Sequence, residues 1–171
     1  LINRLEKNWV INNDGEKIYG DFIHIIPEQK AGKIISDSKL CNSDWCKINP
    51  QTFQLLNFKD IYVVGDSIDA GDMPKSAFSA ESQAKILSLN LVNRILQKAY
   101  LDPVFLNTCY SFSSYNRAFS ITSWYKLNSN NDRIVSLGSS QSSEDGLLDE
   151  RLRESKEAYG WYESITKTLY G

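Results

Sequence analysis

The sequence predicts an α/β fold that becomes α+β in its C-terminal part. The apolar run at residues 61–64 stops at Gly65-Asp66, and a long helical pattern begins at Ser79, which is typical of a buried parallel strand that leads into a helix. A second helical pattern begins at Leu147. Three further segments have the composition of strands in a small antiparallel sheet: residues 106–111, 118–125 and 133–137.

Length and charge limit the class of protein. The chain has 171 residues, of which 42% are hydrophobic, and a net charge of -2. This is enough for one globular domain or for two small pieces of a larger one, and it gives no electrostatic reason to expect nucleic acid as a partner. No apolar run approaches the ~20 residues that cross a bilayer. Because the chain opens with Leu1, we expect it to be the C-terminal part of a longer protein whose leader, if any, lies upstream.

The N-terminal residues predict β-structure. Asp14-Gly15 between two short apolar runs is typical of a hairpin. Residues 21–26 predict a buried strand that stops at Pro27. His24, the single histidine, lies within this run, and we interpret it as a hydrogen-bonded core or edge residue rather than a catalytic one. With one histidine, no self-contained zinc site is expected.

Helical patterns predict three helical segments. Residues 31–36 predict a helical turn, and a longer helix is expected from its N-cap at Ser79 to about Gln97. The C-terminal helix that starts at Leu147 is expected to be interrupted at Gly160. The apolar face predicted for the longer helix consists of Ala80, Ala84, Leu87, Leu91 and Ile95.

A carboxylate and a lysine are the first candidates for a binding site. Gly65 at the end of a strand would let a cofactor approach the backbone, and Asp66 would accept a hydrogen bond from a ribityl hydroxyl, which indicates a flavin enzyme. The alternative is that Asp66 caps a turn. Lys75 precedes a helix N-terminus and would stabilise negative charge on a reduced flavin; otherwise it is a solvated surface lysine.

The cysteines and one tryptophan leave alternatives open. Cys109 lies within a predicted strand, and this pattern by itself favours a small buried hydrophobic residue. Cys41 and Cys46 share a loop at residues 40–50 and either pair with each other or are inert thiols. Trp161 either packs in the core or forms an aromatic wall against a flat cofactor.

Together, several segments resemble the C-terminal portion of the flavoprotein subunit of flavocytochrome c sulfide dehydrogenase. This family is related to the sulfide:quinone oxidoreductases and the pyridine nucleotide-disulfide oxidoreductases. The similar segments, in chain order, are Ile26-Pro-Glu-Gln-Lys-Ala-Gly32, Trp45-Cys46, Val63-Val-Gly-Asp66, Met73-Pro-Lys-Ser76 with Ser79-Ala-Glu-Ser-Gln83, Leu106-Asn-Thr-Cys-Tyr-Ser111 and Trp161-Tyr162.

The resemblance implies the C-terminal half of a flavoprotein disulfide reductase-like fold with two dinucleotide-binding domains. Residues 1–35 would then end a central nucleotide-binding-like domain, and residues 36–98 would return to the FAD-binding domain. Residues 99–171 would form a flavin-facing domain with a small antiparallel sheet and a closing helix.

The resemblance also implies a site and a reaction. Cys109 would be the more C-terminal member of a redox-active cysteine pair, which reverses the interpretation from the pattern alone. Sulfide would be oxidised at this pair, and electrons would pass through FAD to a cytochrome c subunit in the periplasm. The residues implied to contact FAD are Gly65, Asp66, Met73, Pro74, Lys75, Ser76 and Trp161.

Some parts of the family pattern are absent from the sequence. There is no Gly-x-Gly-x-x-Gly fingerprint, no second redox cysteine in a matching motif and no residue for covalent FAD attachment, and the loop at residues 67–72 is more acidic than the family pattern. The chain alone is therefore expected to bind FAD weakly or not at all and to catalyse no turnover. The alternatives are a sulfide:quinone or NAD(P)H-type flavoenzyme, or a non-catalytic remnant without cofactor. The terminal helix ends without an apolar tail, which favours a soluble acceptor over quinone.

Overall fold

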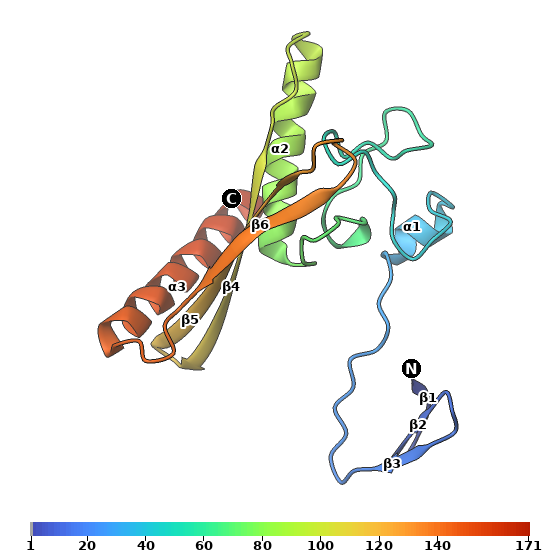
Figure 1. The fold of residues 1–171 in the computed structure, drawn as a ribbon, viewed down its shortest axis with the longest axis vertical. Helices are drawn as coiled ribbons and strands as arrows, with labels where there is room; N and C mark the ends of the chain where they lie inside the picture. The colour runs from blue at the N-terminus through green and yellow to red at the C-terminus, as the bar shows by residue number, and fades with distance from the viewer. Residues whose placement is uncertain (1) are drawn as a thin grey trace. The chain divides into compact units, whose positions relative to one another are not determined.

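The computed structural model describes residues 2–171, which divide into two compact units, residues 2–30 and residues 31–171 (Figure 1). Each unit contains one three-stranded sheet, and helices occur in the second unit. Within residues 2–171, all pairs of named strands are antiparallel. The α+β part of the predicted fold class is therefore confirmed. The predicted domain boundaries at residues 35 and 98 concern the intact enzyme and stay predictions.

The first unit is an antiparallel meander. Its strands, in chain order and in sheet order, are β1 (Ile2–Glu6), β2 (Trp9–Asn12) and β3 (Lys17–Tyr19). In the β2–β3 turn, Oδ1 of Asn12 accepts hydrogen bonds from the backbone N–H groups of Asp14 and Glu16 at 3.0 and 2.9 Å. Gly15 has φ +82°, which a glycine adopts without strain. The predicted hairpin is confirmed.

The predicted buried strand at residues 21–26 is wrong. These residues form no strand, and the side chains of Phe22 and Ile26 are 88% and 79% exposed. His24 is exposed as well, so its interpretation as a core or edge histidine is also wrong. A β-rich composition forms a strand only where a neighbouring strand satisfies the backbone, and no described strand pairs with this segment.

The second unit joins helices to an antiparallel sheet with strand order β4-β5-β6. Its elements are α1 (Lys33–Asp37), the 3₁₀ turn η1 (Gly65–Ser67), α2 (Ala77–Ile95), β4 (Val104–Ser114), β5 (Arg117–Leu127), β6 (Ile134–Gln141) and α3 (Leu148–Tyr170). The helix α3 runs alongside β5 and β4, and α2 packs against β4 (Figure 1). The three strands, the turn at α1 and the C-terminal helix are as predicted.

The core of the second unit lies where the irregular segment from α1 to Met73 meets the sheet. At its centre, the side chains of Phe53 and Phe105 have no exposure, and their rings pack edge to face with centroids 5.9 Å apart. Cys41 and Cys46 form a disulfide, so the pairing alternative is confirmed for them. Cys46 is fully buried in this core, so the disulfide links the irregular segment at Cys41 to a core residue.

The predicted parallel strand at residues 61–64 is not formed. Tyr62 makes a single antiparallel bridge to Gln54, and Ile61, Val63 and Val64 pack partly buried against the core. These apolar residues therefore contribute to the core, as predicted, although they form no strand. The strand is absent because no neighbouring strand among the described residues extends the bridge into a ladder.

The helix α2 begins earlier than predicted and buries a different face. Its N-cap is Ser76, whose Oγ accepts the backbone N–H of Ser79 at 3.1 Å, so the prediction that Ser79 is the cap is wrong. On the predicted apolar face, Leu87 packs partly buried against the core as expected, but Ile95 is 79% exposed. The fully buried residues are instead polar: Ser79, Gln83 and Asn90. Each of them has hydrogen-bond partners from distant segments: Ser79 bonds to Asn107 on β4, Gln83 to Gly65 in η1, and Asn90 to Gln51 and Leu101.

The helix α3 continues through Gly160, so the predicted interruption is wrong. A glycine in a helix interior costs about 1 kcal/mol relative to alanine, which weakens the helix without ending it. A Cβ built at Gly160 meets no atom within 4 Å. The continuous helix carries Trp161 alongside the sheet. No helix of the described residues is long and apolar enough to cross a membrane.

Candidate functional site

The candidate site is built around a free thiol on an edge strand. Side chains alternate along β4, so Phe105, Asn107 and Cys109 share one face. Phe105 is fully buried, Asn107 is 4% exposed and Cys109 is exposed, so the thiol lies just beyond the end of the core. Cys109 is the free cysteine of the described chain, since Cys41 and Cys46 bond to each other. The pattern-based interpretation of Cys109 as a buried hydrophobic residue is therefore wrong.

A pocket of about 510 Å³ opens at this edge of the sheet, between the N-terminus of α2 and the side of α3. Because β4 is an edge strand, residues from both of its faces reach the pocket. Three residues predicted from the sequence lie together here, although they are far apart in the chain: Ser76, Cys109 and Trp161. The structure thus places the thiol beside a helix N-terminus and an indole ring.

Aromatic rings form the walls of this pocket. The rings of Phe78 and Trp161 are stacked, with centroids 5.4 Å apart and an interplanar angle of 15°. The rings of Phe112 and Tyr159 lie 5.2 Å apart on the same pocket. Nε1 of Trp161 is buried and has no hydrogen-bond partner in the described protein. A buried N–H without a partner costs free energy, so the indole donor is an unsatisfied group beside this pocket.

A second pocket, of about 790 Å³, lies on the other side of the α2 N-terminus and is lined by Gly65. Ala77 lines both pockets. Gly65 has φ +75°, and a Cβ at this position would lie 3.2 Å from Cβ of Ala80, so glycine is needed both for the turn and for close packing on α2. Its backbone N–H donates a 2.8 Å hydrogen bond to Oε1 of Gln83.

Lys75 is held in a specific environment. Its Nζ donates a 2.7 Å hydrogen bond to the carbonyl oxygen of Ile68 and lies 3.8 Å from the ring centroid of Trp45. Partial burial lowers the pKa of Lys75, and the nearby carboxylates of Asp66 and Asp69 act in the opposite direction. Lys75 is an exposed residue, as a surface lysine would be, but its ammonium group is held by the Ile68 carbonyl and the Trp45 ring.

The remaining predicted residues do not line the thiol pocket. Asp66 is exposed within η1, and Pro74 is exposed in the segment before α2. The side chain of Met73 is 4% exposed and packs in the core, where its sulfur lies 3.8 Å from Nε2 of Gln83. Their predicted contacts to a cofactor stay predictions.

A polar chain that sequence reasoning missed connects the α2 N-terminus to the thiol. Asn107 accepts hydrogen bonds at Oδ1 from the hydroxyls of Ser76 and Ser79, at 2.6 and 3.2 Å. Its Nδ2 lies 3.4 Å from Sγ of Cys109 and donates to it. The two-residue spacing between Asn107 and Cys109 in a strand was the signal that they share a face.

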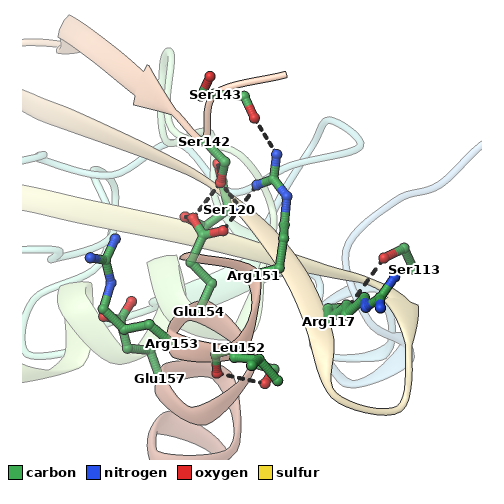
Figure 2. Close-up of polar contacts among 11 residues, drawn as sticks. Ser113, Arg117, Ser120, Ser142, Ser143, Arg151, Leu152, Arg153, Glu154 and Glu157 are labelled. Atoms are coloured by element: carbon green, nitrogen blue, oxygen red, sulfur yellow. Dashed lines mark hydrogen bonds and ion pairs between the residues drawn. The ribbon is translucent and has the colours of Figure 1, made fainter. Parts of the chain in front are cut away.

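A buried carboxylate holds α3 against the sheet (Figure 2). Glu154 is 4% exposed and accepts hydrogen bonds from the hydroxyls of Ser120 on β5, at 2.9 Å, and Ser142. Arg151, one turn earlier on α3, donates to the same carboxylate at 3.1 Å and to the backbone carbonyl of Ser143. This network fixes the helix that carries Trp161 into the pocket.

The Glu154 network makes stability depend on pH. Burial by itself raises the pKa of Glu154, but the hydrogen bonds from Ser142, Ser120 and Arg151 outweigh it and lower that pKa below the ordinary 4.5. Because the folded pKa is depressed, the carboxylate's contribution is complete above the pKa of the unfolded chain and is lost as pH falls through the folded pKa.

We therefore expect the difference in unfolding free energy between the wild type and Glu154→Gln to be constant near neutral pH and to shrink below about pH 4.5. Urea unfolding followed by circular dichroism at a series of pH values measures it. A difference that is the same at pH 7 and pH 3 would contradict this account.

This small α+β unit has a thiol on an edge strand and stacked aromatic rings in one pocket, an arrangement that suits a flat cofactor such as a flavin. Residues 101–169, which span β4, β5, β6 and α3, match the family described as flavocytochrome c sulphide dehydrogenase, flavin-binding. Over these residues the chain is similar to a flavin-binding domain, which is consistent with FAD as the cofactor. The match supports a flavin-dependent oxidoreductase.

The residues of the pocket fit a flavin. The stacked rings of Phe78 and Trp161 offer apolar surface for a flat ring system. Ser76 and Ala77 place the N-terminus of α2 at the same pocket, where free N–H groups favour negative charge. Among the described residues, no group of three or more histidine, cysteine or acidic side chains gathers as a metal site would require.

Proposed function

We propose that this chain is the C-terminal part of an FAD-dependent sulfide dehydrogenase in which Cys109 is a redox-active cysteine. The observation that supports this most directly is the position of the free Cys109 thiol in the same pocket as Trp161 and the N-terminus of α2. In the intact enzyme, residues 1–35, 36–98 and 99–171 would belong to the nucleotide-binding-like, FAD-binding and flavin-facing domains of a disulfide reductase-like fold.

In the proposed reaction, Cys109 begins as half of a disulfide with a cysteine from outside this chain. Attack of hydrosulfide on one sulfur breaks that S–S bond, forms a new S–S bond in a persulfide and releases the other cysteine as a thiolate. FAD supplies an acceptor for two electrons that can release them one at a time. Cys41 and Cys46 are bonded to each other, so neither serves as the second cysteine in this structure.

The other residues would bind and orient. Trp161 would pack against the isoalloxazine ring, and the N-terminus of α2 with Ser76 and Lys75 would stabilise negative charge on the pyrimidine side of the reduced ring. Gly65 and Asp66 would hold the ribityl–pyrophosphate region, and Met73 and Pro74 would shape the segment between them. A cytochrome c subunit is the proposed electron acceptor, and the periplasm is the proposed compartment.

The test is anaerobic mixing of sulfide with the flavin-loaded holoprotein expressed from the complete gene, followed by addition of cytochrome c. Sulfide is expected to bleach the visible absorbance of the bound flavin, and reduction of cytochrome c is then expected to restore it. NADH serves as the matched reductant. A holoprotein that is reduced by NADH but not by sulfide, or that transfers electrons to quinone but not to cytochrome c, would overturn the proposal in favour of a related flavoenzyme.

A further inference from the structure

We propose that Asn107 is a positioning residue that stabilises the thiolate form of Cys109 by donating its side-chain amide hydrogen bond to the sulfur. This inference rests on the proposed function, in which Cys109 becomes a thiolate or a leaving sulfur when its disulfide opens. It assigns a role to a buried polar side chain that the proposed reaction does not otherwise use.

The geometry of β4 brings the two side chains together. Asn107 and Cys109 are two residues apart on an extended strand and therefore project from the same face. Nδ2 of Asn107 lies 3.4 Å from Sγ of Cys109, which is within hydrogen-bond distance for a sulfur acceptor. Asn107 is only 4% exposed, so water competes little for its amide.

The orientation of the Asn107 amide is set by the start of α2. The Oγ of Ser76 accepts the backbone N–H of Ser79 at 3.1 Å, which leaves the hydroxyl proton of Ser76 free to donate to Oδ1 of Asn107 at 2.6 Å. The hydroxyl of Ser79 donates to the same oxygen at 3.2 Å. Because two donors occupy Oδ1, the NH₂ group is turned toward Cys109, where a negative sulfur is a better acceptor than a neutral one.

Few other groups around Cys109 favour a negative charge on its sulfur, so this hydrogen bond matters for the thiolate. The pocket residues around Cys109 include no charged side chain; the other titratable groups that line it are Tyr110, Tyr159 and Tyr162. Burial is the main cause that raises the pKa of Tyr110, and the carboxylates of Glu157 and Glu154 on α3 raise it further. These two carboxylates therefore oppose negative charge on the side of the pocket that faces α3. The favourable contributions come from the Asn107 amide and the α2 N-terminus, which the same serines connect.

The first test is Asn107→Asp, which keeps an acceptor oxygen for Ser76 and Ser79 but removes the donor to sulfur. Under non-reducing conditions Cys109 is the free thiol of the described chain, so alkylation of the 171-residue protein by iodoacetamide, located by peptide mass mapping, reports on it alone. We expect the rate constant at pH 7 to fall, because the thiolate is the reactive form and it loses its hydrogen-bond donor. Asn116→Asp, an exposed position in the β4–β5 turn, makes the same charge change and should react like the wild type.

An unchanged alkylation rate in Asn107→Asp, with a wild-type circular dichroism spectrum, would overturn the inference.

The second test needs no variant at Asn107, so it can be used even if Asn107→Asp does not fold. In the wild-type chain, the side-chain NH₂ resonances of Asn107 should shift with pH together with the onset of Cys109 alkylation, and this step should vanish in Cys109→Ser. Resonances that stay constant while Cys109 becomes reactive would also overturn it.

Neither measurement uses flavin or sulfide, so the two proposals fail separately. A holoprotein that sulfide does not reduce, but whose Asn107→Asp variant alkylates slowly, would overturn the proposed function and leave the role of Asn107 toward the thiol intact. If sulfide reduces the Asn107→Asp holoprotein at the wild-type rate and Cys109 is alkylated as fast as in the wild type, the role of Asn107 is overturned and the proposed function stands.

Discussion

Cys109→Ser is expected to leave FAD bound and to slow the reduction of that flavin by sulfide on the order of a thousandfold or more. A serine hydroxyl cannot form the disulfide that hydrosulfide attacks, and it is a far weaker nucleophile than a thiolate. The pocket walls from Phe78 and Trp161 do not depend on the sulfur atom, so cofactor content should be preserved. Stopped-flow absorbance of the holoprotein gives the rate, and the flavin-to-protein ratio gives the occupancy.

The matched control is Ser113→Ala, on the same strand but outside the pocket. It removes one side-chain oxygen from an exposed position and should be reduced at the wild-type rate. Should Cys109→Ser bind FAD and be reduced by sulfide as quickly as the wild type, Cys109 would not be a redox cysteine. Loss of flavin from Cys109→Ser, with the fold intact, would point to a binding role instead.

Glu154→Ala is expected to lower the free energy of unfolding by about 3 kcal/mol. The substitution leaves Arg151, whose side chain is 16% exposed, without its carboxylate, and it removes the acceptor from the hydroxyls of Ser120 and Ser142. Unpaired groups of this kind cost far more than the net value of the interactions that they made. Urea unfolding at neutral pH, followed by far-ultraviolet circular dichroism, measures the loss.

The same helix offers a matched control, because Figure 2 shows a second arginine–glutamate pair close by. Arg153 and Glu157 are paired at 3.5 Å, but their side chains are 67% and 51% exposed. Glu157→Ala should therefore change stability by less than about 0.5 kcal/mol. Equal losses for the two variants would show that burial of Glu154 does not determine its contribution.

The sequence predicted those elements whose signal is local. Asp14-Gly15 predicted the hairpin because a tight turn needs a residue that tolerates positive φ, and Gly15 has φ +82°. The strands β4, β5 and β6 were predicted from their composition. The apolar residues at 61–64 and 21–26 carry the same kind of signal, yet neither segment is a strand, because composition does not supply a partner strand.

In the candidate site too, the sequence predicted individual residues, whereas their contacts depend on segments that are distant in the chain. Ser76, Cys109 and Trp161 were predicted from motifs, but their meeting in one pocket depends on β4 being the edge strand next to the α2 N-terminus. Phe78 was missed because ring stacking between α2 and α3 has no signature in either helix. Asn107 was part of a motif, but its role depends on two serines that lie 31 and 28 residues away in the chain.

By itself, the sequence determined the turn residues, the strand and helix content of residues 104–170 and the residue types that suit a thiol next to a flat cofactor. Only the tertiary structure decided that the buried face of α2 is polar, that Cys109 is exposed and that Asn107 donates to its sulfur. The physical reason is that backbone conformation follows from neighbouring residues, whereas burial, hydrogen-bond partners and local charge are set by segments that are distant in the chain.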